Sequence, residues 1–228
     1  MFKNLKNNIH SQNGEDGIIE FVLSKLPNKD NWCCEFGAWD GKYLSNTYNL
    51  VENSNYTAVY IEGDNEKFND LLNTKGKIIP IKQWVGVSGD ELLDNILSKT
   101  EIPKNFDVLS IDVDGTDYCI WEKFVNYKPK IVIIEINSNF DPEILINNNV
   151  LEYEKMKLRS GSNIGGVNFK TCYELGKRKG YRLVTHTGNM IFIDEEYSNY
   201  FDNLLDDSNY LECFENLWFS TDKTEIPD

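Results

Sequence analysis

Three acidic residues gather directly after one apolar run of the sequence. The run 106–111 is near-continuously apolar, as a buried parallel strand is, and Asp112, Asp114 and Asp117 follow it within six positions. Such closely spaced carboxylates repel one another and raise each other's pKa unless a cation or a hydrogen-bond donor compensates. The cluster therefore predicts a metal ion, a cationic ligand or a general base, with one of the three acids expected to cap the following helix.

A second polar group follows the first apolar run of the chain. Residues 31–46 read Asn-Trp-Cys-Cys-Glu-Phe-Gly-Ala-Trp-Asp-Gly-Lys-Tyr-Leu-Ser-Asn, which is typical of a strand, an acidic glycine turn and a helix start. Gly37 and Gly41 permit a tight turn close to a ligand, and Ser45 and Asn46 are expected to cap or line the helix. The turn carries acids in place of the residues of a phosphate-binding loop. It therefore suits a ligand with a cationic part, such as S-adenosylmethionine.

Two further strand ends offer contacts to a nucleotide-like ligand. Glu62 ends the apolar run 57–62, and an acid at the end of the second strand of such a unit binds ribose hydroxyls. Trp84 follows the run 77–82 and is placed to stack on an adenine ring. The alternatives are a strand-end carboxylate that faces water and a tryptophan that packs in the core. The acidic turn upstream favours the ribose role for Glu62.

Polar residues at a fifth apolar run extend the acidic cluster. Glu135 ends this run and Asn137 follows, so both lie beside Asp112 if the fourth and fifth strands are neighbours. Residues 138–168 form a long polar stretch, and long loops at this edge of an α/β sheet are usually substrate lids. Arg159 in that stretch is a candidate substrate contact.

The two histidines are further candidate bases. His186 ends the predicted strand 181–186, which Thr187-Gly188 joins to a second strand, 189–194, in a short hairpin. A solvated hairpin histidine is the alternative to a base at this position. His10 lies in the polar segment ahead of the first predicted helix.

The composition is that of one globular domain outside a membrane. A chain of 228 residues suffices for one α/β core. Its net charge of −14 argues against non-specific binding to nucleic acid or to an anionic membrane surface. No apolar run approaches the roughly 20 residues of a membrane span, and the N-terminus lacks the apolar core of a signal peptide. The 5 cysteines are scattered, which predicts reduced thiols. We therefore expect a cytoplasmic protein.

Apolar periodicity predicts alternating strands and helices. The strands are expected at 31–36, 57–62, 77–82, 106–111, 129–135, 181–186 and 189–194, with helices at 65–75, 90–99 and 169–179, among others. This order predicts an α/β fold with a mostly parallel seven-stranded sheet that ends in an antiparallel hairpin and has helices on both faces. Pro80 places the third strand at an edge. One domain is expected, with a cap segment 1–28, a core 29–194 and an acidic, aromatic cover 195–228.

In these motifs the chain resembles class I S-adenosylmethionine-dependent methyltransferases, and more narrowly their FkbM-like branch. The resemblance covers roughly residues 10–194 and implies a Rossmann-like fold. It rests on Ser11-Gln-Asn-Gly-Glu-Asp16, Glu35-Phe-Gly-Ala-Trp-Asp-Gly41, Ser110-Ile-Asp-Val-Asp-Gly115 and Ile134-Glu-Ile-Asn137. The chain departs from the class I pattern at Trp39, where a small residue often stands.

The resemblance implies a site for S-adenosylmethionine. The methionine part would lie over Glu35 and Gly37, the ribose hydroxyls would bind Glu62, and Trp84 would neighbour the adenine. Asp112 would sit beside the sulfonium and the acceptor. The complete implied set is Gln12, Glu35, Gly37, Ala38, Asp40, Ser45, Asn46, Glu62, Trp84 and Asp112, with Ser11 and Gln12 folding over the site from the N-terminal segment.

The resemblance also implies a reaction and a metal. FkbM-like enzymes are associated with O-methylation, often of sugars, so the implied acceptor is a hydroxyl of a sugar or glycan or of another small molecule. Similar sugar O-methyltransferases hold a divalent ion, and the matching residues would be Asp112 and Glu135, with Asn137 as a third ligand. An oxygen-rich set of this kind suits Mg²⁺ or Mn²⁺ and not zinc.

Removal of the hydroxyl proton from the acceptor requires a general base. Asp114 is the preferred base, with His186 or His10 as the fallback.

Two other classes of function compete with methyl transfer. One alternative is a Rossmann-like binding or partner-docking domain without catalysis. A nicotinamide-dependent oxidoreductase is disfavoured because Trp39 stands where its second turn glycine belongs. The oligomeric state and the acceptor are not predicted by the sequence.

Overall fold

The computed structural model describes residues 2–202, 204–213 and 225 of the chain. Its strands are β1 (Trp32–Phe36), β2 (Thr57–Glu62), β3 (Lys77–Lys82), β4 (Val108–Ile111), β5 (Ile131–Glu135), β6 (Tyr181–His186) and β7 (Asn189–Asp194). Its α-helices are α1 (Glu15–Lys25), α2 (Tyr48–Asn53), α3 (Asn65–Leu71), α4 (Leu93–Leu97), α5 (Asp117–Lys123), α6 (Tyr153–Arg159) and α7 (Phe169–Arg178). None of the helices in these ranges is long and apolar enough to cross a bilayer.

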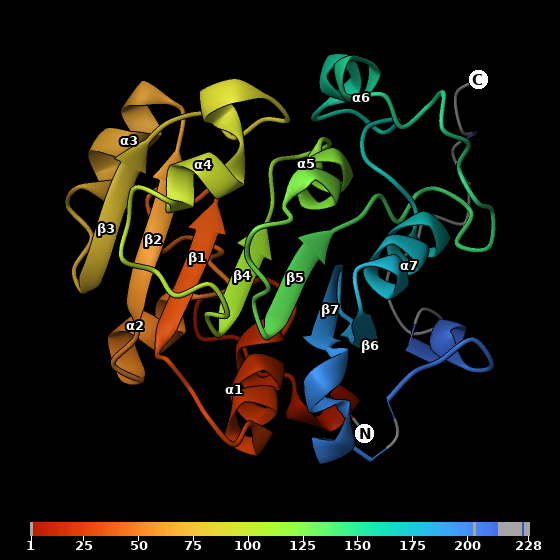
Figure 1. Ribbon diagram of the computed structural model, residues 1–228, viewed down its shortest axis with the longest axis horizontal. Coiled ribbons are helices and arrows are strands. Elements are labelled where there is room, and N and C mark those ends of the chain that lie inside the picture. The colour runs from red at the N-terminus through yellow and green to blue at the C-terminus, as the bar shows by residue number, and fades with distance from the viewer. Residues whose placement is uncertain (1, 203, 214–224, 226–228) are drawn as a thin grey trace.

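The strands form one 7-stranded sheet in the order β3-β2-β1-β4-β5-β7-β6 (Figure 1). Strands β1 to β5 pair in parallel, whereas β7 pairs antiparallel with both β5 and β6. The predicted sheet, its closing hairpin and the edge position of Pro80 are therefore confirmed. The strand order reverses between β1 and β4, and ligands of open α/β sheets bind beside such a reversal, at the carboxyl ends of the strands.

Helices cover both faces of the sheet, as predicted. Alternate residues of each strand point to opposite faces, so Cys33 and Cys34 enter two different cores. Cys33 packs in the core under α1, α2 and α3, and Cys34 packs in the core under α4, α5 and α7. Both strand faces are buried, which explains why the strands read as continuous apolar runs.

The structure corrects several predicted boundaries. The helix predicted over 90–99 is limited to α4, because Leu92 is extended (ψ 129°) and separates it from a short 3-10 turn. The long polar stretch contains α6, which buries only Met156 and so lacks the apolar periodicity that reveals a helix. The predicted C-terminal cover forms two 3-10 helices, Glu195–Tyr200 and Tyr210–Cys213, with Phe201 directly after the first, whereas Phe214, Trp218 and Phe219 lie outside the described residues.

Candidate functional site

A cavity of about 410 Å³ opens at the carboxyl ends of β4 and β5. Its lining includes six candidate residues predicted from the sequence: Gln12, Asp112, Asp114, Asp117, Glu135 and Asn137. The rest of the lining comes from the loops after β4, β5 and α6, from the hairpin turn between β6 and β7, and from the N-terminal segment. Most of these residues are polar, and none is a lysine or an arginine. The cavity therefore suits a hydroxyl-rich or cationic ligand.

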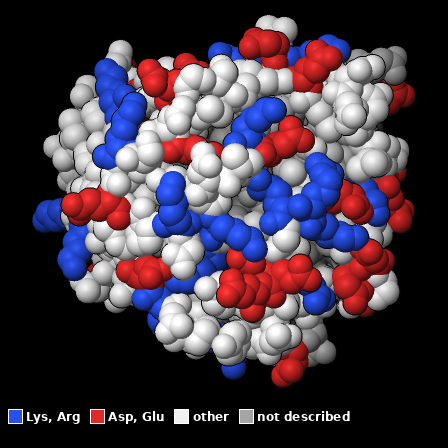
Figure 2. Space-filling view, viewed as in Figure 1, with Lys and Arg blue, Asp and Glu red and all other residues white. Residues whose placement is uncertain are grey.

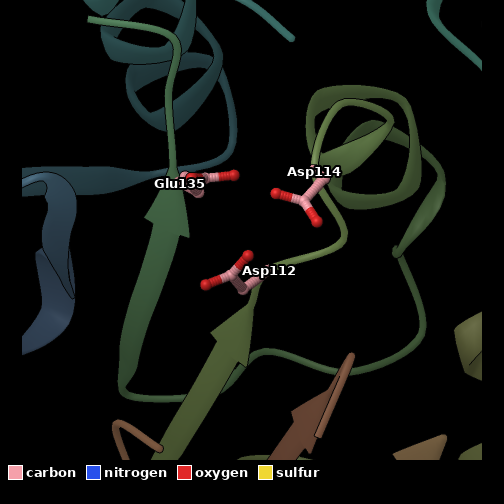
Figure 3. Close-up of side chains that lie close together, drawn as sticks. All are labelled: Asp112, Asp114 and Glu135. Atoms are coloured by element: carbon pink, nitrogen blue, oxygen red, sulfur yellow. The ribbon is translucent and has the colours of Figure 1, made fainter. Parts of the chain in front are cut away.

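The carboxylates of Asp112, Asp114 and Glu135 converge in this cavity (Figure 3). One oxygen from each lies within 4.8 Å of the others. Asp114 adopts a left-handed backbone conformation (φ 58°), and Gly161 N–H holds its carbonyl oxygen at 2.8 Å. Asp117, by contrast, accepts the N–H groups of Val113 and Gly115 at 2.8 Å each. It therefore shapes the loop, and the prediction that one of the acids caps the helix is wrong, because Thr116 is the N-cap residue of α5 and no side chain of the described residues caps that helix.

Burial and the charges of neighbouring acids raise the pKa values of Asp112 and Glu135. Burial raises the pKa of Asp112 well above its usual range, and the charges of Asp117 and Asp114 raise it further. Burial, followed by the charge of Asp112, raises the pKa of Glu135 to about 9. The cluster is thus stable only with bound protons or with a cation. Three converging oxygen donors fit Mg²⁺ or Mn²⁺, and Asp114 completes the donor set.

Glu135 should make the stability of the metal-free protein depend on pH. A carboxyl group whose pKa lies near 9 when folded, but near 4.3 when unfolded, favours folding at low pH and loses this contribution as pH rises between the two values. Chelator-treated Glu135→Gln is therefore expected to melt several degrees above the wild type at about pH 8.5, and this gap should shrink at about pH 5.

The matched control for this experiment is Glu143→Gln, because Glu143 is an exposed acid of the loop that follows β5. Its melting temperature should follow that of the wild type at both pH values. A Glu135→Gln variant that melts no higher than the control at the alkaline pH would show that the cluster is not strained by its charges.

The side chain of Asn137 is already engaged by the loop around it. Its Nδ2 donates to the carbonyl oxygens of Asn163 (2.9 Å) and Gly165 (2.7 Å), and its Oδ1 accepts Asn139 N–H at 3.0 Å. These bonds fold the loop after α6 against the end of β5. Asn137 therefore builds the cavity wall, and only the second lone pair of Oδ1 is left for a ligand.

The N-terminal segment reaches the cavity through Gln12 and Asn13, and Ser11 is not among the lining residues. Asp16 Oδ2 accepts the N–H groups of Ile9, His10 and Ser11 at 2.8 Å each, which curls the segment back onto α1. The Ser11 hydroxyl in turn accepts Asp16 N–H at 3.1 Å, in the first turn of that helix. Gln12, the next residue, reaches the cavity.

Glu15 joins this segment to the turn between β6 and β7, the last two strands in the order of the sheet. It is fully buried. Its Oε1 accepts the Thr187 hydroxyl at 2.7 Å and Asn189 Nδ2 at 3.4 Å, and its Oε2 accepts Asn13 N–H at 2.7 Å. Asn13, Thr187 and Asn189 all line the cavity. One carboxylate thus fixes two walls of the site.

Removal of the Glu15 carboxylate is expected to loosen both walls together. Glu15→Ala leaves buried donors without acceptors, so it should cost about 1–3 kcal/mol of unfolding free energy. Amide hydrogen exchange should become faster both near Asn13 and in the hairpin turn. The control is Glu20→Ala on the same helix, an exposed residue whose carboxylate accepts Asn49 Nδ2 at 2.7 Å. Unchanged exchange in the hairpin turn would contradict the bridging role.

The acidic glycine turn after β1 is organised by Glu35. This buried carboxylate accepts the hydroxyls of Ser45 and Thr47 and, at 3.3 Å, the Asn46 N–H. Thr47 was not predicted as part of this site, although its hydroxyl directly follows the predicted pair Ser45 and Asn46 in the sequence. Burial raises the pKa of Glu35, although these donors counteract the effect. Glu35 therefore shapes the turn, and it does not line the cavity.

Other residues of the turn serve its shape as well. A Cβ on Gly37 (φ 71°) would lie 1.9 Å from the Asp112 carbonyl oxygen, so glycine permits the close approach of β1 to the end of β4. Asp40 Oδ1 accepts the N–H groups of Lys42 and Tyr43, and Ala38 N–H donates to the Ile61 carbonyl. The side chain of buried Asn46 donates to the Ser110 hydroxyl at 3.1 Å.

Glu62 and Trp84 lie together beyond the cavity. Glu62 accepts Trp39 N–H at 2.9 Å and Asp64 N–H at 2.8 Å, one on each carboxylate oxygen. A Cβ on Gly63, the next residue, would lie 2.2 Å from the Trp84 ring, which is 64% exposed. An oriented carboxylate next to an accessible indole fits a ribose and its adenine.

Three candidate residues lie apart from the acidic cavity. His186 is buried against Phe169, with ring centroids 5.4 Å apart, and burial lowers its pKa to about 4. His10 pairs with Glu52 at 2.7 Å. The Arg159 guanidinium donates to the carbonyls of Lys155 and Val150. None of these three side chains lines the cavity, so Asp114 is the base candidate that the geometry supports.

Comparisons with known proteins give similarities of fold alone. No protein-family model matches the chain, and no curated protein matches it. A solved SAM-dependent methyltransferase from Aquifex aeolicus is 12% identical over 77% of this chain and 87% of that chain, with a TM-score of 0.41. The plantazolicin methyltransferase BamL, in complex with a triazolic desmethylPZN analog and SAH, is 11% identical over 89% and 73%, with a TM-score of 0.48. The CurJ carbon methyltransferase is 12% identical over 78% and 52%, with a TM-score of 0.46.

Proposed function

We propose that this protein is an S-adenosylmethionine-dependent O-methyltransferase that acts on a hydroxyl of a sugar or glycan. The convergence of Asp112, Asp114 and Glu135 in a polar cavity is the observation that carries this proposal. The cavity lies at the carboxyl ends of β4 and β5, next to the strand-order reversal where cofactors of open α/β sheets bind.

The cofactor would extend from the cavity toward the end of β3. In this arrangement Glu62 binds the ribose hydroxyls and Trp84 contacts the adenine, while Glu35 and Gly37 maintain the turn beneath the methionine part. The cofactor supplies an activated methyl group on a sulfonium. Burial and neighbouring acids suppress the ionisation of Asp112, and the positive charge of the sulfonium would offset that effect and favour the charged carboxylate.

Acceptor binding would fall to the polar walls of the cavity. Amide and hydroxyl groups of Gln12, Asn13 and Ser162 match the donors and acceptors of a polyhydroxyl compound. Asp114, which is exposed, is positioned to take the hydroxyl proton and release it to solvent. A Mg²⁺ or Mn²⁺ ion on Asp112 and Glu135 would supply Lewis acidity, with Asp114 and Asn137 as further oxygen donors.

Calorimetric titration with S-adenosylhomocysteine, with and without Mn²⁺, tests the proposal. We expect binding with a Kd of about 100 μM or tighter, lost in Glu62→Gln because the amide accepts the ribose hydroxyls poorly. Glu66→Gln on α3 is the control, since Glu66 is an exposed acid of the same region. An absence of binding in both conditions would contradict methyl transfer, whereas binding without methyl transfer to any acceptor would favour a non-catalytic binding domain.

A further inference from the structure

A second cavity, of about 400 Å³, lies between the C-terminal ends of α5 and α7. Helices that connect parallel strands run against them, so this α5–α7 groove is at the amino end of the sheet, opposite the acidic cavity. Its lining residues are Trp121, Glu122, Phe124, Val125, Tyr127, Lys128, Leu175, Arg178, Lys179 and Tyr181. The two cavities share no lining residue. The volume of the groove is that of a small-molecule site.

The charge of the α5–α7 groove is opposite to that of the whole chain. Lys128, Arg178 and Lys179 line it, against the single carboxylate of Glu122, in a protein whose net charge is −14. Figure 2 shows lysine and arginine side chains gathered over the part of this face where α5 and α7 lie. Local positive charge in a concave site concentrates anions even when the protein as a whole repels them.

The cations of the α5–α7 groove are only partly neutralised. Lys179 Nζ donates to the Phe124 carbonyl at 2.7 Å, so its bonded acceptor is a neutral group, and burial lowers the pKa of Lys179 to about 8. Arg178 donates to the Tyr118 hydroxyl at 3.0 Å, and its closest approach to Glu122 is 3.9 Å. Lys128 pairs with Asp194 at 2.7 Å. Arg178 and Lys179 thus retain donors for a ligand.

Helix capping explains only part of this arrangement. Basic residues near helix C-termini are favourable, and one lysine at the Phe124 carbonyl satisfies that need for α5. It does not account for Arg178, which lies next to that lysine in the sequence and lines the same groove, or for Val125, another lining residue, which is 70% exposed. A planar guanidinium and an ammonium side by side match the oxygens of a phosphoryl group, and the apolar rim accommodates the remainder of a ligand.

We propose that the α5–α7 groove binds the phosphoryl group of a small phosphorylated molecule through Arg178 and Lys179. The site is independent of methyl transfer, because it lies at the other end of the sheet and shares no residue with the acidic cavity. Binding there requires no covalent step. Its occupant is defined by one or two phosphoryl groups and a compact, partly apolar body.

Titration of the full chain with inorganic pyrophosphate, at constant ionic strength, tests the assignment. We expect saturable binding with a Kd of about 1 mM or tighter. The double variant Arg178→Gln/Lys179→Gln should weaken it at least about tenfold. The control double variant Lys25→Gln/Lys75→Gln removes the same charge from exposed positions outside the groove and should change the Kd less than about twofold.

A third variant leaves the cations in place. Glu122→Gln removes the carboxylate of the groove and should tighten binding about threefold, which a folding defect would not do. An absence of saturable binding, or equal weakening by both double variants, would overturn the proposal. The affinity for S-adenosylhomocysteine should be the same in all of these proteins, so a failure of the methyltransferase proposal would be seen separately.

Discussion

Asp112→Asn is expected to weaken the binding of S-adenosylmethionine by about 10–100-fold while leaving the fold intact. Asparagine keeps the shape of the side chain and removes the charge that would face the sulfonium. S-adenosylhomocysteine has a neutral thioether in that place, so its affinity should fall much less. The ratio of the two affinities, measured by titration calorimetry, therefore reports the charge of Asp112 and not its packing.

The same variant should melt at a higher temperature than the wild type at about pH 8. Burial and the charges of Asp117 and Asp114 raise the pKa of Asp112, so a neutral side chain at this position relieves repulsion. Weaker cofactor binding together with a higher melting temperature is hard to obtain from a folding defect. Asp141→Asn, in the loop that follows β5, is the control and should change neither quantity. An equal loss for both ligands would contradict a role next to the sulfonium.

The sequence was sufficient to predict the sheet, because buried parallel strands are readable as apolar runs. The strands at 57–62, 77–82, 181–186 and 189–194 have the predicted bounds. Helices were predicted less well where tertiary contacts replace periodicity, as in α6, which is short and has one buried side chain. The convergence of acids from the ends of β4 and β5 was also predictable, because neighbouring parallel strands end at the same edge.

The partners of buried polar groups were not predictable in the same way. Glu35 has the sequence position of a ligand contact, yet three donors from one turn surround its carboxylate. Glu15 binds a hydroxyl that is 172 residues away in the chain. Such pairings depend on how loops meet in space, and periodicity along one segment contains no information about them. The long polar loop was expected as a lid, but its glycine-rich end forms a cavity wall through backbone contacts with Asn137.

Asp107 holds a buried charge network at the amino end of the sheet, where the sequence indicated only a strand. It is fully buried. It accepts hydrogen bonds from Lys130 Nζ at 2.6 Å, from the Tyr56 hydroxyl at 2.9 Å and from Asn31 N–H at 2.9 Å. Lys130 also pairs with Asp30 at 2.6 Å. Burial lowers the pKa of Lys130, but its hydrogen bonds to Asp107 and Asp30 more than offset this and raise it.

Asp107→Ala is therefore expected to destabilise the protein by about 3–5 kcal/mol, because it leaves a buried ammonium and a buried hydroxyl without their main acceptor. Urea unfolding at neutral pH measures this loss as a lower midpoint with an unchanged slope. Asp30→Asn, at a partner that is 34% exposed, should cost about 1 kcal/mol or less. A midpoint for Asp107→Ala equal to that of Asp30→Asn would contradict a central role for Asp107.

Function should survive this loss of stability. Asp107 directly precedes β4 and Asp112 directly follows it, so the network and the acidic cavity lie at opposite ends of the same strand. Well below its melting temperature, Asp107→Ala should bind S-adenosylhomocysteine with an affinity within about twofold of the wild type, since distant sites act independently. Weaker binding by folded Asp107→Ala would mean that the network also sets the position of the cavity, through the register between β1 and β4.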